Sequence, residues 1–335
     1  MKKVNCLIVG SGLAGVTIAW KLYQKNISFH IISNPHLSSS SIIAPGIINP
    51  IVFKRMIPSW NITELLSISQ SFYKNIEQTL QQKIFENIQI AHCLHSDDDE
   101  ILWKEKQFFY PQFLGEITTL NDLPIKNIKQ NFKCGMVLNA ARLKVSEYIY
   151  YSLNYFKNIN AYSEEKFYHE NLLINEKILE YNQIIAEKII FCEGYHLQSN
   201  PFFQHISLKP AKGELVEIST PRPIMPENIV LHYHLNIIPN SPNKYLIGSN
   251  YEWQNIDEYP TQNIKEKFLS VFDSLFDVSY DVIGHYAGVR PASLDRRPII
   301  QQHPEFSNLF TINGFGTKGV MLAPYAADEL LKSLI

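Results

Sequence analysis

The chain has 335 residues, of which 45% are hydrophobic and 19% are charged. This length exceeds what one hydrophobic core usually serves, so we expect two domains of ordinary globular composition. The formal net charge of −2 gives no electrostatic argument for binding to nucleic acid or to an acidic membrane surface.

The cysteines and the apolar runs indicate the compartment. Cys6, Cys93, Cys134 and Cys192 lie far apart and form no CxxC pair, so we expect reduced thiols and no disulfide scaffold. The apolar run that begins at Cys6 contains glycines at fixed spacing, which argues against a signal peptide. No stretch reaches the roughly 20 apolar residues of a membrane helix. A soluble, cytoplasmic protein is the expectation.

The first 33 residues predict a strand, a turn, a helix and a second strand. Val4–Val9 is an apolar run of the kind found in buried parallel strands, and Gly10 ends it. Leu13–Gln24 has helical spacing, and Ile27–Ile32 is a second apolar strand. Residues 38–50 follow as a loop rich in serine, proline and glycine.

Further elements alternate between the two types along the chain. Helices are expected over 63–80, 140–156, 264–276 and 320–334, and another helix starts at the carboxylate-rich segment 97–100. Strands are expected over 184–191, 215–218, 229–238, 245–247 and 309–312. The order predicts an α/β fold in which a discontinuous Rossmann-like domain carries an antiparallel-sheet α+β domain. The predicted limits are 1–82, 135–205 and 285–335 for the first domain, and 83–134 and 206–284 for the second.

The turn after the first strand has the pattern GxGxxG, formed by Gly10, Ser11, Gly12, Leu13, Ala14 and Gly15. The first glycine permits the tight turn, the second lets a pyrophosphate approach the backbone, and the third allows close helix–strand packing. The helix N-terminus then faces the phosphate charge. This context predicts dinucleotide binding, and a glycine-rich turn without a ligand is the alternative.

One expected feature of a dinucleotide site is missing. An acidic residue usually ends the second strand and binds the ribose hydroxyls. Here Ser33 and Asn34 occupy that place. Their side chains hydrogen-bond a hydroxyl without a charge, so we expect the contact to be weaker by about 1 kcal/mol.

Five blocks, in order from end to end, resemble the D-amino-acid oxidase superfamily of FAD-dependent oxidoreductases. The resemblance is to the subgroup of glycine oxidase, sarcosine oxidase and the oxidase half of a tRNA wobble-uridine modification enzyme. The blocks are the glycine turn, residues 40–50 (SSIIAPGIINP), residues 189–194 (IIFCEG), residues 288–291 (GVRP) with Asp295 and Pro298, and residues 313–319 (NGFGTKG).

The resemblance implies FAD as the cofactor and assigns residues to it. The loop that contains Ser40, Ser41, Ala44 and Gly46 would run under the flavin and the pyrophosphate. The strand ending at Glu193 and Gly194 would pass beside the adenine, where a smaller residue than glutamate is usual. The fourth block contributes Gly288, and the turn Gly314, Gly316, Thr317, Lys318, Gly319 and Val320 would place a helix N-terminus at the pyrimidine edge of the flavin.

The chemistry explains these residue types. Oxidation of a C–N bond needs an electron acceptor that no side chain provides, and a flavin is such an acceptor. Backbone N–H groups and the dipole of the helix that begins at Val320 suit the negative charge that arrives on it. Lys318 either adds a full positive charge there or is an exposed turn lysine.

Four more side chains are candidates for the substrate site. Arg290 offers a planar fork that pairs with a carboxylate, and a structural ion pair is the alternative. Arg55 either meets a second anionic group or is solvated. Tyr251 and Trp253 either line the substrate pocket or pack in an aromatic core. Arg296 and Arg297 are expected to form a salt-bridged turn with Asp295.

Metal and nucleophile chemistry is not expected. His92 with His95, and His232 with His234, have too few partners for a closed zinc site. Cys192 ends a buried strand and is expected to be a packing residue. Neither GxSxG nor HExxH occurs in the sequence.

Three functions stay open. The first is oxidation of an amino acid or N-substituted glycine by hydride transfer to flavin N5, with oxygen or another electron acceptor completing the cycle. The second is a tRNA wobble-uridine carboxymethylaminomethyl oxidase, against which the formal net charge of −2 argues. The third is a flavoprotein that binds a metabolite or partner without turnover. Substrate, acceptor and oligomeric state are not predicted.

Overall fold

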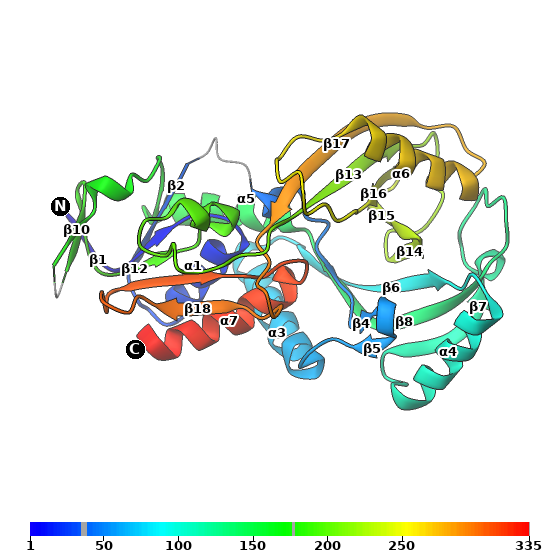
Figure 1. The fold of residues 1–335 in the computed structure, drawn as a ribbon, viewed down its shortest axis with the longest axis horizontal. Helices are drawn as coiled ribbons and strands as arrows, with labels where there is room; N and C mark the ends of the chain where they lie inside the picture. The colour runs from blue at the N-terminus through cyan, green and yellow to red at the C-terminus, as the bar shows by residue number, and fades with distance from the viewer. Residues whose placement is uncertain (35–38, 176–177, 335) are drawn as a thin grey trace.

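Two large β-sheets organise the protein. The computed structural model describes residues 1–34, 39–175 and 178–334. One sheet has 8 strands and the other has 9. They lie at opposite ends of an elongated molecule, with the helices α1 (Leu13–Gln24) and α7 (Gly319–Leu334) beside the first sheet and α3 (Ile62–Leu80) next to α7 (Figure 1). No helix among the described residues is long and apolar enough to cross a membrane.

The first sheet joins segments from the beginning, middle and end of the chain. β12 (Ile184–Phe191) pairs in parallel with β1 (Lys2–Val9), and β2 (Phe29–Ser33) and β9 (Tyr162–Glu164) follow on the same side. On its other side, β12 pairs in parallel with β19 (Leu309–Asn313). The remaining strands are β10 (Leu173–Ile174), β11 (Leu179–Tyr181) and β18 (Ile299–Gln302). Parallel strands buried in this way need the near-continuous apolar runs that the sequence has.

Four helices pack against one another, and all of them except α3, which contacts the second sheet, also pack against the first sheet. They are α1 (Leu13–Gln24), α3 (Ile62–Leu80), α5 (Val145–Asn158) and α7 (Gly319–Leu334). Buried polar contacts fix them: Trp20 Nε1 donates to Ser152 Oγ at 2.7 Å, and Tyr73 Oη donates to the Val320 carbonyl at 2.8 Å. The N-terminus of α7 is thereby held close to α1 and α3.

The second sheet has the strand order β17-β13-β16-β15-β14-β6-β8-β3, and β7 pairs with β8. Its pairs are antiparallel except for β14 with β6. α6 (Gln262–Leu275) covers one face through the buried side chains of Phe268 and Phe272. The strands are β3 (Ile47–Ile48), β6 (Phe85–Cys93), β7 (Leu114–Thr119), β8 (Lys133–Leu143), β13 (Ala211–Ser219), β14 (Ile229–Tyr233), β15 (Leu235–Ser241), β16 (Lys244–Gly248) and β17 (Asp281–Arg290).

Short elements complete the chain. The helix α4 (Asp97–Phe109) packs against β7, and its Ser96 side chain accepts a hydrogen bond from the Asp99 N–H at 3.2 Å. The others are α2 (Ser40–Ile43), β4 (Ile51–Val52), β5 (Ile57–Pro58) and the 3-10 turns η1 (Phe53–Arg55), η2 (Leu120–Asp122), η3 (His169–Asn171) and η4 (Gly194–Ser199).

Most predicted elements are confirmed, and three are wrong in part. α1 and β12 have the predicted limits, and the α/β class with a second sheet is confirmed. Ala140–Leu143, predicted as helix, is the end of β8. The run 229–238 is a hairpin of two strands that turns at His234, where φ is 57°. The predicted loop contains α2 and β3, and its first residue lies outside the described residues.

The predicted domain limits stay a proposal. The two sheets divide the chain in the same interleaved manner, with segments of the first sheet before, between and after those of the second. β8 and β17 both belong to the second sheet. A division by sheet therefore assigns residues 133–143 and 281–290 to the second domain.

The four cysteines are free and buried. Cys192 is a packing residue, as predicted, and its burial raises the pKa of its thiol. Cys93 and Cys134 lie opposite each other on β6 and β8, with 3.5 Å between their sulfur atoms.

Candidate functional site

The glycine turn between β1 and α1 depends on the absence of side chains. Gly10 has a φ of 104°, and a Cβ there would lie 2.4 Å from the carbonyl oxygen of Cys192. A Cβ on Gly15 would lie 1.9 Å from the carbonyl oxygen of Gly10. Both distances are far below contact, so only glycine allows the turn and the helix to pack this closely.

The N-terminus of α1 opens toward the loop that contains α2. Gly12 is the N-cap residue of α1 and has no capping side chain, and Ser41 Oγ accepts a hydrogen bond from the Leu13 N–H at 3.1 Å. A Cβ on Gly12 would lie 3.3 Å from Ser41 Oγ and 3.4 Å from Ser39 Oγ. Hydroxyl groups and N–H donors at the positive end of a helix dipole, without an acidic group in the first turn, fit a diphosphate. Ala14 lies in that first turn.

The end of β2 carries polar side chains from three elements. Ser11 Oγ donates to Ser33 Oγ at 2.8 Å, and Asn34 follows as the next residue. Ser33 lies opposite Glu164 in the parallel pair of β2 with β9. Burial and the charge of Glu164 raise the pKa of Tyr162, and a hydrogen bond with Ser11 opposes them. The carboxylate of Glu164, which the sequence analysis did not identify, therefore lies beside β2, the strand whose end lacks an acidic residue.

Contacts with neighbouring side chains explain how a glutamate is accommodated at position 193. Its carboxylate accepts a hydrogen bond from Asn200 Nδ2 at 2.6 Å and lies 3.0 Å from His169 Nε2. The side chain is 11% exposed. The carboxylate is thus held by η3 and by the segment after η4, so the glutamate is accommodated by side chains of this chain. Gly194, which follows it, has a φ of 56° and its carbonyl accepts from Asn313 Nδ2 at 2.8 Å.

The loop after β2 packs directly on β17. A Cβ on Gly288 would lie 2.6 Å from Ile43 Cδ1 and 3.3 Å from the Cα of Ser40. Ala44 ends α2, and Gly46 has a φ of 77° with the Leu143 carbonyl in the space of its missing side chain. These contacts bring the second and fourth sequence blocks together.

The turn before α7 brings a second helix N-terminus to the same place. Gly314 and Gly316 have φ values of 79° and 53°. α7 begins at Gly319 and Val320, and a Cβ on Gly319 would lie 3.0 Å from Leu13 Cδ2. The first turns of α1 and α7 are therefore neighbours, and Thr317 lies exposed between them and the solvent.

Lys318 is not an exposed turn lysine. Its Nζ donates to Ser59 Oγ. Burial, with a smaller effect from the positive charges of Arg296, Arg297 and Arg55, lowers the pKa of Lys318 to about 8. Those three arginines therefore lie close enough to act on it, and Arg55 is exposed at the tip of the hairpin formed by β4 and β5.

This group of cations has no acidic partner among the described ion pairs. The expected salt bridge of Asp295 is wrong: its carboxylate accepts a hydrogen bond from the backbone N–H of Arg297 at 3.0 Å. The Arg297 guanidinium instead lies over the ring of Trp60, 4.0 Å from its centroid. The backbone hydrogen bond from Arg297, with a smaller effect from the charge of that residue, lowers the pKa of Asp295, so this carboxylate lies near the cations. The group of the three arginines and Lys318 still has more positive than negative charge, which favours a negatively charged ligand.

Arg290 lies at the end of β17, where β13 and the segment after β16 meet it. Its Nη2 donates to Ser249 Oγ at 2.7 Å, and its Nη1 donates to the Asn250 carbonyl at 3.1 Å and more weakly to the Lys212 carbonyl at 3.4 Å. No carboxylate of the described residues forms an ion pair with it. The alternative of a structural ion pair is thus wrong, and burial lowers the pKa of a guanidinium that has only neutral partners.

Tyr251 and Trp253 form an exposed stack beside Arg290. Their ring centroids are 5.7 Å apart with an interplanar angle of 16°, and they are 51% and 59% exposed. The guanidinium carbon of Arg290 lies 4.9 Å from the centroid of the Tyr251 ring. The interpretation as an aromatic core is wrong, and both rings are available to a ligand.

The histidine pairs stack with aromatic side chains. Phe53 lies 4.2 Å from the His92 ring and 4.6 Å from the His232 ring, centroid to centroid, and His95 stacks on His234 at 4.1 Å. Burial lowers the pKa of His92 to about 3 and that of His232 to about 4. Within the described parts of the chain no group of three or more histidine, cysteine, aspartate or glutamate residues has metal-binding geometry.

Three buried charged residues escaped sequence reasoning. Lys212 and Glu214 on β13 are both 1% exposed. Arg142 on β8 is 5% exposed and donates to the Pro45 carbonyl, the Pro239 carbonyl and Asn240 Oδ1, so it joins the loop after α2 to β15. Their sequence signal is a charged residue inside an apolar strand, which is also typical of strands with one solvated face.

Comparison with known proteins agrees with this geometry. Residues 172–332 match the family described as FAD dependent oxidoreductase (DAO). Glycine oxidase of Pseudomonas aeruginosa is 22% identical over 354 aligned residues, which cover 98% of this chain and 94% of that protein.

Two solved structures have the same fold. Glycine oxidase from Geobacillus kaustophilus superposes with a TM-score of 0.81 at 16% identity, covering 100% of this chain and 95% of the other. Iminodiacetate oxidase from Chelativorans sp. BNC1 superposes with a TM-score of 0.78 at 17% identity, covering 97% and 94%. Residues 172–332 are therefore similar to the DAO family of FAD-dependent oxidoreductases, and the chain has the fold of the solved glycine oxidase.

Proposed function

We propose that this protein oxidises the C–N bond of a small amino acid or an N-substituted glycine. The observation that carries the proposal is the guanidinium of Arg290, which is partly buried, has only neutral hydrogen-bond partners and adjoins two exposed aromatic rings. A buried cation without an acidic partner is costly, and a substrate carboxylate would supply the missing charge. The names of the related enzymes, glycine oxidase and iminodiacetate oxidase, support the same class of substrate.

FAD fits the residues that surround the two helix N-termini. The first turn of α1, with Ser39 and Ser41 facing Gly12, would hold the diphosphate. The first turn of α7, with the Lys318 ammonium, would face the part of the flavin that becomes negative. When bound, FAD accepts the hydride that leaves the carbon next to the amine.

The residues of the second sheet would orient the substrate. Arg290 would bind the carboxylate through its planar fork and so fix the carbon that is oxidised. Tyr251 and Trp253 would contact the side chain or the substituent on nitrogen. Arg55, at the tip of its hairpin, would meet a second anionic group of the substrate.

The setting of the reaction is also a proposal. The free cysteines favour the cytoplasm, where thiols stay reduced. Oxygen or another electron acceptor would take the electrons from reduced FAD.

The absorption spectrum of the purified protein tests the cofactor, and an anaerobic titration tests the reaction. We expect a flavin band that bleaches when glycine, N-methylglycine or iminodiacetate is added under argon. Protein that is colourless and does not reconstitute with FAD contradicts the cofactor assignment. A flavin band that survives every amino acid and N-alkylglycine contradicts the oxidation and favours a binding protein without turnover.

Arg290→Met removes the fork while keeping an unbranched side chain. We expect kcat/KM to fall about 100-fold, equivalent to about 3 kcal/mol of transition-state binding, because the carboxylate loses two charge-assisted hydrogen bonds. Arg222→Met, at an exposed position, is the control for loss of one arginine. Unchanged kcat/KM in Arg290→Met contradicts the role of the guanidinium.

One observation favours a second candidate, an amine carried on RNA. The group of Arg55, Arg296 and Arg297, together with the exposed stack of Tyr251 on Trp253, resembles the combination of cations and aromatic rings that binds single-stranded nucleic acid. A gel shift with bulk tRNA that weakens steeply with salt supports this candidate. Absence of a shift at low salt leaves the small-molecule substrate.

A further inference from the structure

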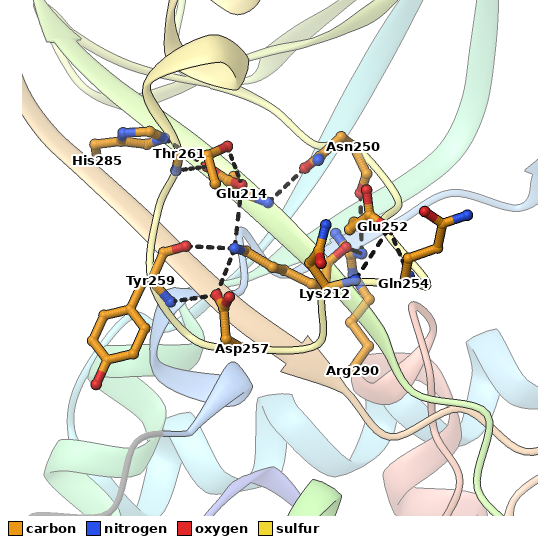
Figure 2. Close-up of polar contacts among 11 residues, drawn as sticks. Lys212, Glu214, Asn250, Glu252, Gln254, Asp257, Tyr259, Thr261, His285 and Arg290 are labelled. Atoms are coloured by element: carbon orange, nitrogen blue, oxygen red, sulfur yellow. Dashed lines mark hydrogen bonds and ion pairs between the residues drawn. The ribbon is translucent and has the colours of Figure 1, made fainter.

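The side chain of Lys212 is buried on β13 and contacts the chain segment that contains Asp257 and Tyr259. Its Nζ lies 2.6 Å from Asp257 Oδ1 and 3.7 Å from Glu214 Oε1, and it donates to the Tyr259 carbonyl. Figure 2 shows this ammonium between the carboxylates and the loop. The lysine is 1% exposed, whereas the side chain of Asp257 is 47% exposed. The buried ammonium of Lys212 is therefore paired with Asp257, a carboxylate at the protein surface.

Glu214 binds the same segment at Thr261, nearer to its C-terminal end. Its Oε2 accepts from the backbone N–H of Thr261 at 2.7 Å, and its Oε1 accepts from Thr261 Oγ1 at 2.9 Å. His285 Nε2 lies 2.9 Å from Oε2 (Figure 2). Residues 249–261, which we call the strap, are thus fixed to β13 at their C-terminal end.

The N-terminal end of the strap is fixed to the same strand. The backbone of Glu252 exchanges hydrogen bonds with the backbone of Lys212 at 2.9 and 3.0 Å. Asn250 Oδ1 accepts from the Glu214 N–H at 2.8 Å. Ser249 and Asn250 also hold the Arg290 guanidinium, so the strap and this guanidinium form one hydrogen-bonded unit (Figure 2).

The energetic cost of burying Lys212 and Glu214 indicates that these charges hold the strap in position. Burying an ion pair seldom adds net stability, because desolvation offsets most of the attraction. An apolar side chain at 212 would fill the sheet at lower cost, but it could not hold Asp257 and Tyr259. The contacts of this ammonium fix the strap at Asp257 and Tyr259, while the backbone of the same lysine pairs with Glu252, between Tyr251 and Trp253.

We propose that Lys212 is a positioning residue for the substrate site: it holds the strap so that Arg290 and Tyr251 keep one geometry for the substrate carboxylate and its neighbouring group. This inference rests on the proposed function, because it gives Arg290 the carboxylate to bind. The strap is then a fixed wall of the site.

Lys212→Met tests the role, with Lys209→Met as the matched control. Lys209 lies three residues away at an exposed position, so it controls for loss of one lysine. Glu214 keeps its partners Thr261 and His285 in the variant, which favours folding. Asp257→Asn weakens the same anchor at an exposed carboxylate and is the second variant should Lys212→Met fold poorly.

Two measurements on the FAD-bound protein are needed. The first is amide hydrogen exchange of residues 249–261 by mass spectrometry. The second is the Kd of acetate, a carboxylate without an amine to oxidise, followed by its perturbation of the flavin spectrum. Both are made in the wild-type and Arg290→Met backgrounds, which forms a double-mutant cycle.

We expect Lys212→Met to speed exchange in the strap and to weaken acetate binding about tenfold, and to weaken it no further when Arg290 is already replaced. Lys209→Met should change neither quantity. Normal acetate binding in Lys212→Met and Asp257→Asn, with Arg290→Met impaired, overturns the inference alone. Normal acetate binding in Arg290→Met overturns the proposed carboxylate site itself, whatever the strap does. Equal losses from Lys212→Met in both backgrounds show a general structural effect and also overturn the inference.

Discussion

The contribution of Lys318 to the stability of the protein depends on pH, because burial and three nearby arginines lower the pKa of its ammonium to about 8 from an ordinary value of 10.5. Between these two values the unfolded chain holds the proton and the folded chain releases it. The unfolded state therefore binds more protons in this window, and the contribution of Lys318 to the free energy of unfolding increases as the pH rises through it.

The prediction compares wild type with Lys318→Met by urea unfolding at both ends of that window. We expect the free energy of unfolding of wild type to gain on that of the variant as the pH rises from about 8 to about 10.5. Lys54→Met, an exposed lysine of the same neighbourhood, should show no such trend. Parallel curves for wild type and Lys318→Met contradict the perturbed ammonium.

The sequence identified candidate site residues by their chemistry, but it did not identify the residues that contact them. Arg290 and Lys318 stood out because a fork and a helix N-terminus have a definite chemistry, and the structure removes the alternative interpretation of each. Lys212 and Glu214 did not stand out, because a strand of alternating residues is expected to carry charges on its outer face. Only the strap that covers this face makes them buried.

At the scale of elements, α1 depends on one close contact with the turn before it. In Gly15→Ala, the new methyl group would lie 1.9 Å from the carbonyl oxygen of Gly10, so the helix must move away from β1. We expect a loss of about 1–3 kcal/mol in the free energy of unfolding and weaker FAD binding, since the N-terminus of α1 moves with the helix.

Urea unfolding and FAD titration of the apoprotein measure both effects. Lys25→Ala, at the exposed C-cap of the same helix, should change stability by no more than about 0.5 kcal/mol and leave the FAD Kd unchanged. An FAD affinity that survives Gly15→Ala means that this helix end does not contact the cofactor.

Hydrophobic periodicity correctly predicted the elements whose burial follows their own sequence pattern. It failed where pairing with a neighbouring strand determines the structure. Ala140 and Ala141 are good helix formers, yet pairing with β6 places them in a strand. In the run 229–238, His232, His234 and Asn236 alternate with apolar residues, so the turn at His234 does not interrupt the strand-like pattern. The position of Glu164 beside Ser33 depends on β9 pairing with β2, which no local pattern contains.

For the whole molecule, Arg142 links the two halves. Its buried guanidinium joins the Pro45 carbonyl, in the loop that faces α1, to the Pro239 carbonyl and Asn240 of the second sheet. In Arg142→Met these acceptors lose their donors, and the expected cost is about 3 kcal/mol.

Urea unfolding followed by both circular dichroism and flavin fluorescence checks this prediction. We expect Arg142→Met to lower the midpoint and to weaken FAD binding, because the loop with Ser41 loses its connection to β15. Arg222→Met is again the exposed control. A stability equal to that of the control shows that the two halves hold together without this link.

The central position of β12 has a consequence for biosynthesis. β1 reaches its parallel partner only after about half of the polypeptide has left the ribosome, and β19 and α7 arrive with the final segment. The helix N-terminus proposed to face the flavin is therefore absent from every nascent chain that stops before residue 319. We therefore expect firm retention of the coenzyme to need the final segment of the chain, because a shorter translation product keeps only the α1 end of the proposed site.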